Sequence, residues 1–319
     1  MPVRYEKGGD GIVTLTLDAP GAQVNTMTAE WRKAFHAAVE RLQKEKDSIA
    51  GVILCSAKKT FFAGAELKDI LRLTEADGPR FFAEIEETKR QFRALDRLGK
   101  PVVAVLEGAA LGGGWELALA AHCRICLNDE RIELGLPEAT LGLLPGASGV
   151  TKTVRLLGLQ AALGYLVEGK TMRPAEAAKL GLLQGLAANR EDLLRMAREW
   201  IAKNPAPKQP WDEENYRMPG GTPASPQVSQ MLTIAPAMLV EKTRGLYPAP
   251  EAIMAAAAEG ASVDFDTALR IESRYLVKLA VGQVAKNLIT LFFNRTAIRS
   301  GASLERSTSW DRHRLWLTL

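Results

Sequence analysis

The stretch from Val102 to Glu116, VVAVLEGAALGGGWE, is the most informative segment of this chain. Val102 to Leu106 is a continuous apolar run, as in a strand buried on both faces. Glycines at positions 112 to 114 then end the extended segment, and a helix is predicted to begin near Gly113. Such a turn offers free N–H groups and the positive end of a helix dipole beside the end of the strand. Taken alone, the glycines are better explained by close packing of a helix on a strand.

The segments around this stretch alternate between strand and helix. The chain shows period-two or continuous apolar runs at residues 11–17, 51–56, 101–106 and 124–127, which predict strands. Helical periodicity is present at residues 28–46 and 76–98, and again at 151–157, 160–167, 174–180 and 191–203. Alternation of this kind with short connections predicts an α/β architecture.

The composition divides the chain into four parts. Residues 1–203 are expected to form the core, and residues 204–230, rich in proline, glycine and polar side chains, to form a linker or an extended wrap. Residues 231–300 are predicted to be helical, with the strongest run at 264–299. Residues 301–319 lack periodicity and are expected to be a loose tail.

The bulk composition excludes several classes of function. The 41 basic residues are scattered among 37 acidic ones. They form no basic stripe with interleaved aromatics, so nucleic-acid binding is not expected. Apolar runs are shorter than the ~20 residues that span a bilayer, so no membrane span is expected. No signal-peptide pattern opens the chain. Three cysteines form no disulfide framework, which favours a reducing, cytoplasmic compartment.

A metal site is not expected. His122, Cys123 and Cys126 are close in sequence, but zinc spacing requires a second pair of ligands, and the remaining cysteine and histidines do not supply one. We interpret these residues as the end of a helix and the start of a buried strand.

Two glutamates carry the candidate chemistry. Glu116 closes the glycine turn, and Glu138 follows Pro137 just ahead of a second glycine-rich stretch, 142–149. Two carboxyl groups in a dry site do not both ionise readily, so one pKa rises and the pair can supply an acid and a base together. Each glutamate alone is more simply a surface charge, and the hypothesis rests on finding both.

Three segments resemble the signature segments of the crotonase (enoyl-CoA hydratase/isomerase) superfamily. They are FFAGAELK at 61–68, GAALGGGWE at 108–116 and PEATLGLLPGASG at 137–149, and the resemblance covers roughly residues 3 to 200. It implies a crotonase-like spiral of ββα units followed by a C-terminal helical region.

A further resemblance concerns the C-terminal part. PAPE at 248–251 and DTALRIESR at 266–274 are similar to the connecting region of multifunctional fatty-acid oxidation enzymes, which join a hydratase/isomerase domain to a 3-hydroxyacyl-CoA dehydrogenase. No Gly-x-Gly-x-x-Gly follows a strand downstream here, so we expect no NAD cofactor and only a CoA thioester as substrate.

The resemblance also implies roles for individual residues. Glu116 corresponds to the base that activates water, and Glu138 to the acid that protonates C2. The backbone N–H groups of Ala65 and Gly113 correspond to the oxyanion hole. The CoA-binding loop corresponds to Lys59, Ala63, Gly64, Ala65, Leu67 and Lys68.

These expectations favour an enoyl-CoA hydratase of fatty-acid β-oxidation with a minor 3,2-enoyl-CoA isomerase activity. An isomerase-dominated domain and a non-catalytic acyl-CoA-binding or partner-docking subunit remain alternatives. Trp115 is expected either to narrow the acyl pocket or to pack in the core, and Ser148 to be a small turn residue. The C-terminal helices are candidates to cover the site of their own chain. A homo-oligomer or a β-oxidation complex partner is expected, and the monomer, dimer and trimer stay open.

Overall fold

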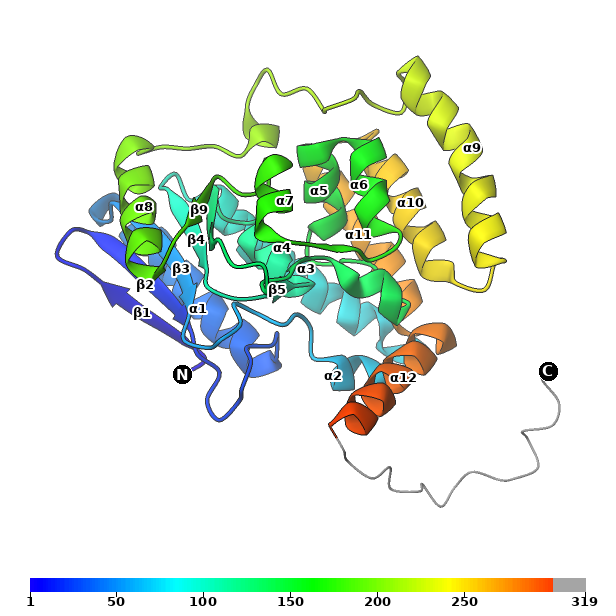
Figure 1. Cartoon of the computed structure of the whole chain (residues 1–319), viewed down its shortest axis with the longest axis horizontal. Helices are drawn as coiled ribbons and strands as arrows, with labels where there is room; N and C mark the ends of the chain where they lie inside the picture. Colours follow the sequence, from blue (N-terminus) through cyan, green and yellow to red (C-terminus); the bar gives the residue numbers. More distant parts are fainter. Residues whose placement is uncertain (301–319) are drawn as a thin grey trace.

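A six-stranded sheet forms the centre of the N-terminal part (Figure 1). The computed structural model describes residues 1–300. The strand order is β1-β2-β3-β4-β6-β9, in which β1 and β2 are antiparallel and all other neighbours are parallel. The strands are β1 Val3–Lys7, β2 Ile12–Leu17, β3 Gly51–Ser56, β4 Val102–Leu106, β6 Cys123–Leu127 and β9 Gly185–Ala187. A smaller sheet, in the order β5-β7-β8, consists of Ala110–Leu111, Leu134–Gly135 and Thr171–Met172.

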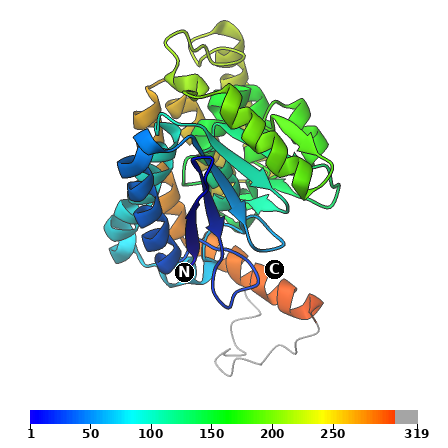
Figure 2. The same cartoon turned by 90° about the vertical axis from the view of Figure 1, so that its left-hand side faces the viewer.

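Helices cover both faces of the large sheet, which confirms the predicted α/β architecture. Helices α1 (Ala29–Glu45) and α3 (Gly78–Asp96) lie on one face, and α8 (Arg190–Lys203) lies on the other (Figure 2). Because side chains alternate along a strand, Leu54 packs toward the first face and Ile53 toward α8. Both faces of the central strands are therefore apolar, as the continuous apolar runs predict.

Helix α1 shows how the sequence sets these elements. The hydroxyl of Thr28 accepts a hydrogen bond from the N–H of Trp31 at 3.1 Å, so Thr28 is the N-cap that the sequence predicts. Trp31 and Phe35 lie one turn apart on the buried stripe, and their rings stack with centroids 4.7 Å apart.

Short helices connect the sheet to the C-terminal part. They are α2 Leu67–Arg72, α4 Gly113–Ala118, α5 Gly149–Leu157, α6 Leu159–Leu166 and α7 Pro174–Lys179. Single 3₁₀ turns lie at η1 Lys46–Ser48, η2 Glu75–Asp77, η3 Pro137–Leu141 and η4 Pro210–Asp212. The start of α4 at Gly113 agrees with the predicted position.

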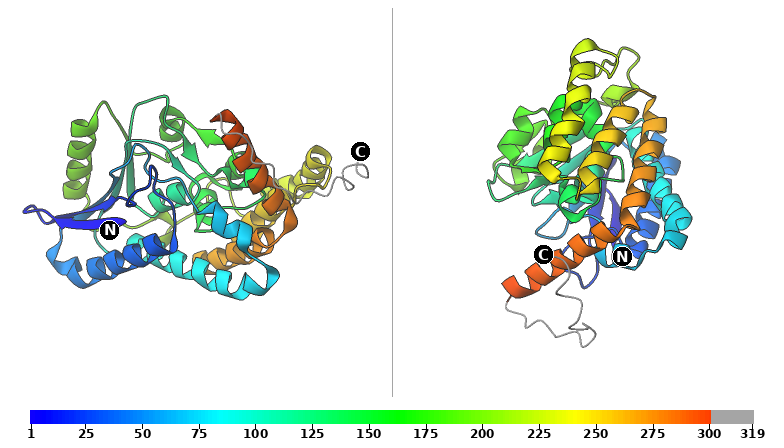
Figure 3. Two further views of the ribbon diagram at one scale, coloured as in Figure 1. Left: turned by 90° about the horizontal axis from the view of Figure 1, so that it is seen from below. Right: turned by 90° about the vertical axis from the view of Figure 1, so that its right-hand side faces the viewer.

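Four helices form the C-terminal region (Figure 3). They are α9 Pro226–Thr243, α10 Pro248–Gly260, α11 Phe265–Ala280 and α12 Gln283–Arg299. The predicted single run at 264–299 is thus two helices, which meet at an angle of 71°. Within residues 1–300 no single helix is long and apolar enough to cross a membrane, although α11 and α12 pass that test as a bent pair.

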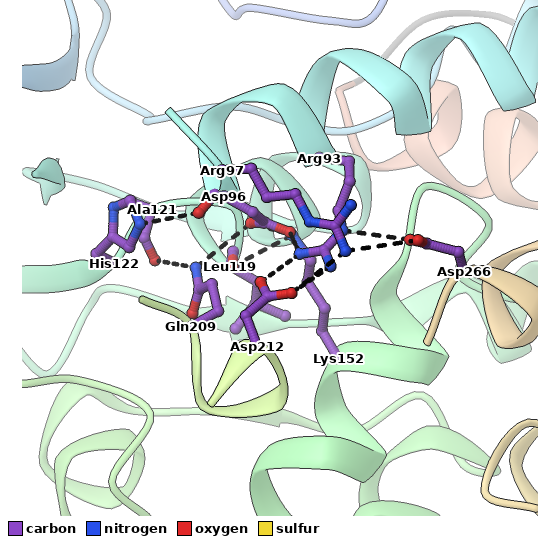
Figure 4. A network of polar contacts seen from close by, with 10 residues as sticks. All are labelled: Arg93, Asp96, Arg97, Leu119, Ala121, His122, Lys152, Gln209, Asp212 and Asp266. Atoms are coloured by element: carbon purple, nitrogen blue, oxygen red, sulfur yellow. Dashed lines mark hydrogen bonds and ion pairs between the residues drawn. The ribbon is translucent and has the colours of Figure 1, made fainter. Parts of the chain in front are cut away.

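The segment expected to be a linker is attached to the core (Figure 4). Asp212 accepts a hydrogen bond from Arg93 Nη1 at 2.6 Å, and the buried Gln209 donates to Asp96 at 3.3 Å. Asp96 also pairs with the buried Lys152 at 2.9 Å. The segment is therefore an extended wrap that is held at the C-terminal end of α3, and Tyr216 further along it donates to Arg155 O of α5 at 2.6 Å.

The boundaries of this segment differ from the prediction at one end. Helix α9 begins at Pro226, which lies inside the expected linker 204–230, because proline at the first helical position is compatible with a helix start. The predicted loose tail, residues 301–319, lies outside the described residues.

Candidate active site

One cavity of about 390 Å³ collects four of the predicted site residues. Ala65, Gly113, Glu116 and Glu138 all line it. They come from the loop after β3, the start of α4 and the turn η3, which are separate in sequence. The structure therefore brings the proposed acid, base and oxyanion-hole groups to one place.

Backbone amides hold the carboxylate of Glu116. Its Oε1 accepts hydrogen bonds from the N–H of Ala147 at 2.7 Å and of Gly149 at 2.6 Å. Glu116 is 2% exposed, so these two donors are what compensates its buried charge. Gly149 has to be small, because a Cβ there would lie 2.7 Å from Glu116 Oε1.

Glu138 has a different environment. Its Oε2 is buried and has no hydrogen-bond partner within residues 1–300. Its Oε1 would lie 2.6 Å from a Cβ at Gly112, whose φ of 55° and ψ of −129° suit glycine alone. Its own backbone N–H is the one donor that favours the ionised form, and burial outweighs it, so a protonated carboxyl is favoured at this position.

Burial and neighbouring negative charges raise the pKa of both carboxyl groups. Burial and then the charge of Glu272 raise the pKa of Glu116 to about 8, while the amides of Gly149 and Ala147 oppose this. Burial and the charge of Glu116 raise the pKa of Glu138 well above its ordinary value. Since only Glu116 has two backbone donors, it is the better candidate for the ionised partner.

Two backbone amides meet at the cavity wall near these carboxyls. Gly113 is the first residue of α4, so its N–H has no partner within the helix. A Cβ on Gly113 would lie 3.8 Å from the amide nitrogen of Ala65. Gly64, with a φ of 96°, allows this approach, since a Cβ there would be 3.1 Å from Leu111 O. Both residues line the cavity, so their N–H groups stay the candidates for the oxyanion hole.

The rest of the cavity lining consists of apolar and charged side chains. The apolar lining comes from α2, α3, the loop before α5 and α11, namely Ile70, Leu73, Phe81, Ile85, Leu143, Leu144 and Leu276. The basic lining consists of Arg32, Arg72 and Arg80. Arg32 and Arg80 both pair with Glu84.

Trp115 lies outside this lining. It is 1% exposed and belongs to the hydrophobic core. Of the two alternatives for Trp115, the structure supports packing in the core.

The predicted CoA-binding residues lie on one loop but not all in the cavity. Of the six, Ala65 alone lines it. Lys59 and Ala63 are exposed on the loop between β3 and α2, Gly64 is buried behind Ala65, and Leu67 and Lys68 begin α2. This loop lies at the edge of the site, and its contact with CoA stays a prediction.

Glu272 of α11 is a further buried carboxylate near the site, and it was not predicted from the sequence. It is 1% exposed and pairs with the buried Lys89 of α3, whose Nζ lies 3.3 Å from Glu272 Oε1. The helical periodicity of the sequence does give one indication that Glu272 is buried. Glu272 falls between Leu269 and Leu276 on the buried stripe of α11, where an apolar residue is expected.

His122 has a structural environment. Its Nδ1 accepts a hydrogen bond from the N–H of Val102 at 3.2 Å, and its Nε2 lies 3.0 Å from Asp96 O. Burial lowers the pKa of His122 to about 4. In the described part of the chain, no group of three or more His, Cys, Asp or Glu side chains is placed to hold a metal ion.

The sequence also matches a known family. A sequence profile described as enoyl-CoA hydratase/isomerase matches residues 7–209. The chain belongs to this family, the crotonase family, as its three motifs predict.

Individual relatives extend the match into the C-terminal helices. The fatty acid oxidation complex subunit alpha of Shewanella sp. (strain MR-4) is 32% identical over 301 residues, covering 94% of this chain and 42% of the relative. The subunit of the same name from Shewanella loihica is 34% identical over 297 residues, covering 92% of this chain and 41% of the relative. The chain thus spans about two fifths of the length of the curated relatives it matches.

Solved structures confirm the predicted crotonase-like fold. Human mitochondrial delta3-delta2-enoyl-CoA isomerase has a TM-score of 0.66 and 20% identity, covering 94% of this chain and all of the other (100%). An enoyl-CoA hydratase from Bacillus halodurans has a TM-score of 0.62 and 22% identity, covering 91% and 100%. At these identities the likeness concerns the fold.

Proposed function

We propose that the chain is an enoyl-CoA hydratase, which adds water across trans-2-enoyl-CoA to give 3-hydroxyacyl-CoA. The observation that carries this proposal is that Glu116 and Glu138 line one cavity together with the amides of Ala65 and Gly113. A non-catalytic acyl-CoA-binding subunit has no need of two buried carboxyls with opposite hydrogen-bonding environments.

The proposed reaction uses each of these groups once. The carboxylate of Glu116 takes a proton from water while the water oxygen forms a bond to C3. The double-bond electrons move to C2 and the thioester oxygen, whose negative charge the amides of Ala65 and Gly113 stabilise. The carboxyl of Glu138 then gives its proton to C2. The net change is addition of one water, which needs no redox cofactor, and a proton returns from Glu116 to Glu138 through solvent.

The remaining lining suits an acyl-CoA substrate. The apolar side chains from α2, α3 and α11 suit the acyl group, and the loop at 59–68 is proposed to hold CoA. Lys59 and Lys68 are exposed there and carry the charge to contact phosphate. Lys59, Ala63, Gly64, Ala65, Leu67 and Lys68 stay candidates as a group.

We further propose that the chain acts in fatty-acid β-oxidation and has a partner in a complex. The support is that the relatives are named as subunits of a fatty acid oxidation complex. The oligomeric state and the cytoplasmic compartment stay predictions.

A direct comparison of two substrates tests the proposal. The purified chain is given crotonyl-CoA and a 3-enoyl-CoA in parallel. The absorbance of the conjugated 2-enoyl thioester, which falls on hydration and rises on isomerisation, is followed together with the gain of one water in the product mass. We expect the 2-enoyl thioester to be hydrated faster than the 3-enoyl thioester is isomerised. Faster consumption of the 3-enoyl substrate favours an isomerase, and binding of CoA thioesters without turnover favours the non-catalytic alternative.

A further inference from the structure

One turn of backbone at the start of α5 holds two carboxylates at once. The N–H groups of Ala147 and Gly149 donate to Glu116. The N–H group between them, that of Ser148, donates to Glu272 Oε1 at 2.7 Å. Successive amides therefore point alternately toward the site and toward α11.

A second group of hydrogen bonds also joins this turn to Glu272. Its Oε2 accepts hydrogen bonds from the N–H and the hydroxyl of Thr151, each at 2.9 Å. Both oxygens of Glu272 are thus used by the turn, and the side chain does not line the cavity. Glu272 acts on the site through the backbone and not by contact with the substrate.

The turn adopts its alternating geometry at a conformational cost. Ser148 has a φ of 100°, which is uncommon for a residue with a Cβ, and it is 1% exposed. Such a conformation persists where the surroundings fix it, and the hydrogen bonds of Glu272 to the N–H of Ser148 and to Thr151 do so here.

Glu272 is in turn fixed from α3. Lys89 Nζ lies 3.3 Å from its Oε1 and donates to Ser273 Oγ at 2.7 Å and to Leu269 O. Ser273 Oγ donates to Glu86 at 2.5 Å. Among the described residues, the charge of Glu272 from α11 raises and that of Lys89 from α3 lowers the pKa of Glu116, and Glu138 shares the cavity with it. Arg32, Arg80 and Glu84 also line this cavity.

We propose that Glu272 is a positioning residue for the hydration reaction: it holds the Ser148 and Thr151 amides so that those of Ala147 and Gly149 bind Glu116. Together with Lys89 it also sets the electric field at Glu116. This inference rests on the proposed function. Glu272 lies outside residues 7–209, the part matched by the family profile. The C-terminal helix α11 is therefore part of the catalytic apparatus and not only a cover.

Removing the charge of Glu272 and removing that of Lys89 should shift the pH profile of kcat/KM in opposite directions. Glu272→Gln removes a negative charge near Glu116, so Glu116 ionises more readily and the acid limb moves down by about one pH unit. Lys89→Gln removes the positive charge, so the limb moves up by about one pH unit. The double variant Glu272→Gln/Lys89→Gln should lie between the two. A merely structural role lowers activity in both variants without opposite shifts.

The positioning role has its own measurement. In Glu272→Gln the amide side chain offers one acceptor oxygen where the carboxylate of Glu272 offers two, so one anchor of the turn weakens and kcat should fall about tenfold. KM should change less than kcat, because Glu272 does not contact the substrate. Glu251→Gln, an exposed carboxyl on α10, is the matched control and should behave as the unaltered chain.

A milder variant keeps the test informative if the charge variants do not fold. Thr151→Val removes one hydroxyl donor to Glu272 and changes no charge. We expect kcat to fall about threefold to tenfold with KM nearly constant. Circular dichroism confirms the folded state of each variant.

The outcomes separate this inference from the proposed function. If the unaltered chain does not hydrate crotonyl-CoA, the proposed function fails. If it does hydrate crotonyl-CoA, the folded charge variants decide: acid limbs that coincide with that of the unaltered chain overturn the positioning role. If the charge variants do not fold, an unchanged kcat of Thr151→Val overturns it.

Discussion

Gly112 and Glu138 lie so close that no side chain fits between them. A Cβ on Gly112 would stand 2.6 Å from Glu138 Oε1, and the φ of 55° at this glycine is itself unfavourable for other residues. The glycine turn at 112–114 therefore also determines where the proposed acid is placed.

This relationship predicts the effect of Gly112→Ala. The added methyl group has to displace the Glu138 carboxyl, so we expect kcat for hydration to fall about 100-fold or more, as for loss of a general acid. Gly164→Ala in α6 is the control, because a Cβ there meets no atom of residues 1–300 within 4 Å. Equal activity in the two variants would show that Glu138 is not placed by Gly112.

The pH dependence of kcat/KM follows from the two carboxyl groups. Glu116 has to be ionised, and its pKa is raised to about 8, so activity should rise as the pH increases through about 8 and be lost below it. Glu138 has to be protonated, and its pKa is raised well above the ordinary value, so activity falls again at higher pH. Measuring initial rates across this range reports both groups in the free enzyme. An acid limb near pH 4 to 5, about the value for an unperturbed glutamate, would contradict the assignment.

Ser148→Gly should stabilise the protein. The φ of 100° costs a residue with a Cβ about 1–2 kcal/mol, and the buried hydroxyl has no hydrogen-bond partner among the described residues. After the larger chain entropy of glycine is subtracted, we expect the free energy of unfolding to increase by about 1 kcal/mol. Urea denaturation measures this difference. Ser262→Gly, at an exposed position without positive φ, should instead destabilise slightly.

Lys152→Met should destabilise the protein strongly. Lys152 and Asp96 are both buried and 2.9 Å apart, so removing the cation leaves a buried carboxylate with weaker compensation from Arg93 at 3.4 Å. Breaking a buried pair from one side typically costs about 3–5 kcal/mol. Thermal unfolding of this variant is compared with that of Lys179→Met, where the lysine lies on the surface. Similar melting temperatures would refute a role for the pair in stability.

Much of the fold follows from local patterns in the sequence. The buried strand at 102–106 and the helix stripe of Trp31 and Phe35 agree with the structure, because apolar periodicity reports which face is buried. The break between α11 and α12 was not predicted, since Gly282 interrupts a periodicity that continues on both sides. The start of α9 at Pro226 was misplaced because proline there was taken as a feature of a linker.

The site residues that lie in sequence motifs could be predicted. The residue that acts through tertiary contacts could not. Glu116 and Glu138 meet in one cavity as expected. The link from Glu272 to Glu116 passes through the amides of a turn 121 to 124 residues away, and no local pattern encodes it. The only indication was a charged residue on a buried stripe.

Hydration of crotonyl-CoA in water labelled with heavy oxygen tests the central claim most directly. We expect mass spectrometry to find one labelled oxygen at C3 of the product from the unaltered chain, and neither Glu116→Gln nor Glu138→Gln to form that product above about one hundredth of its rate. A product without the label, or labelled product formed at an undiminished rate by both folded variants, would contradict hydration by this pair of glutamates.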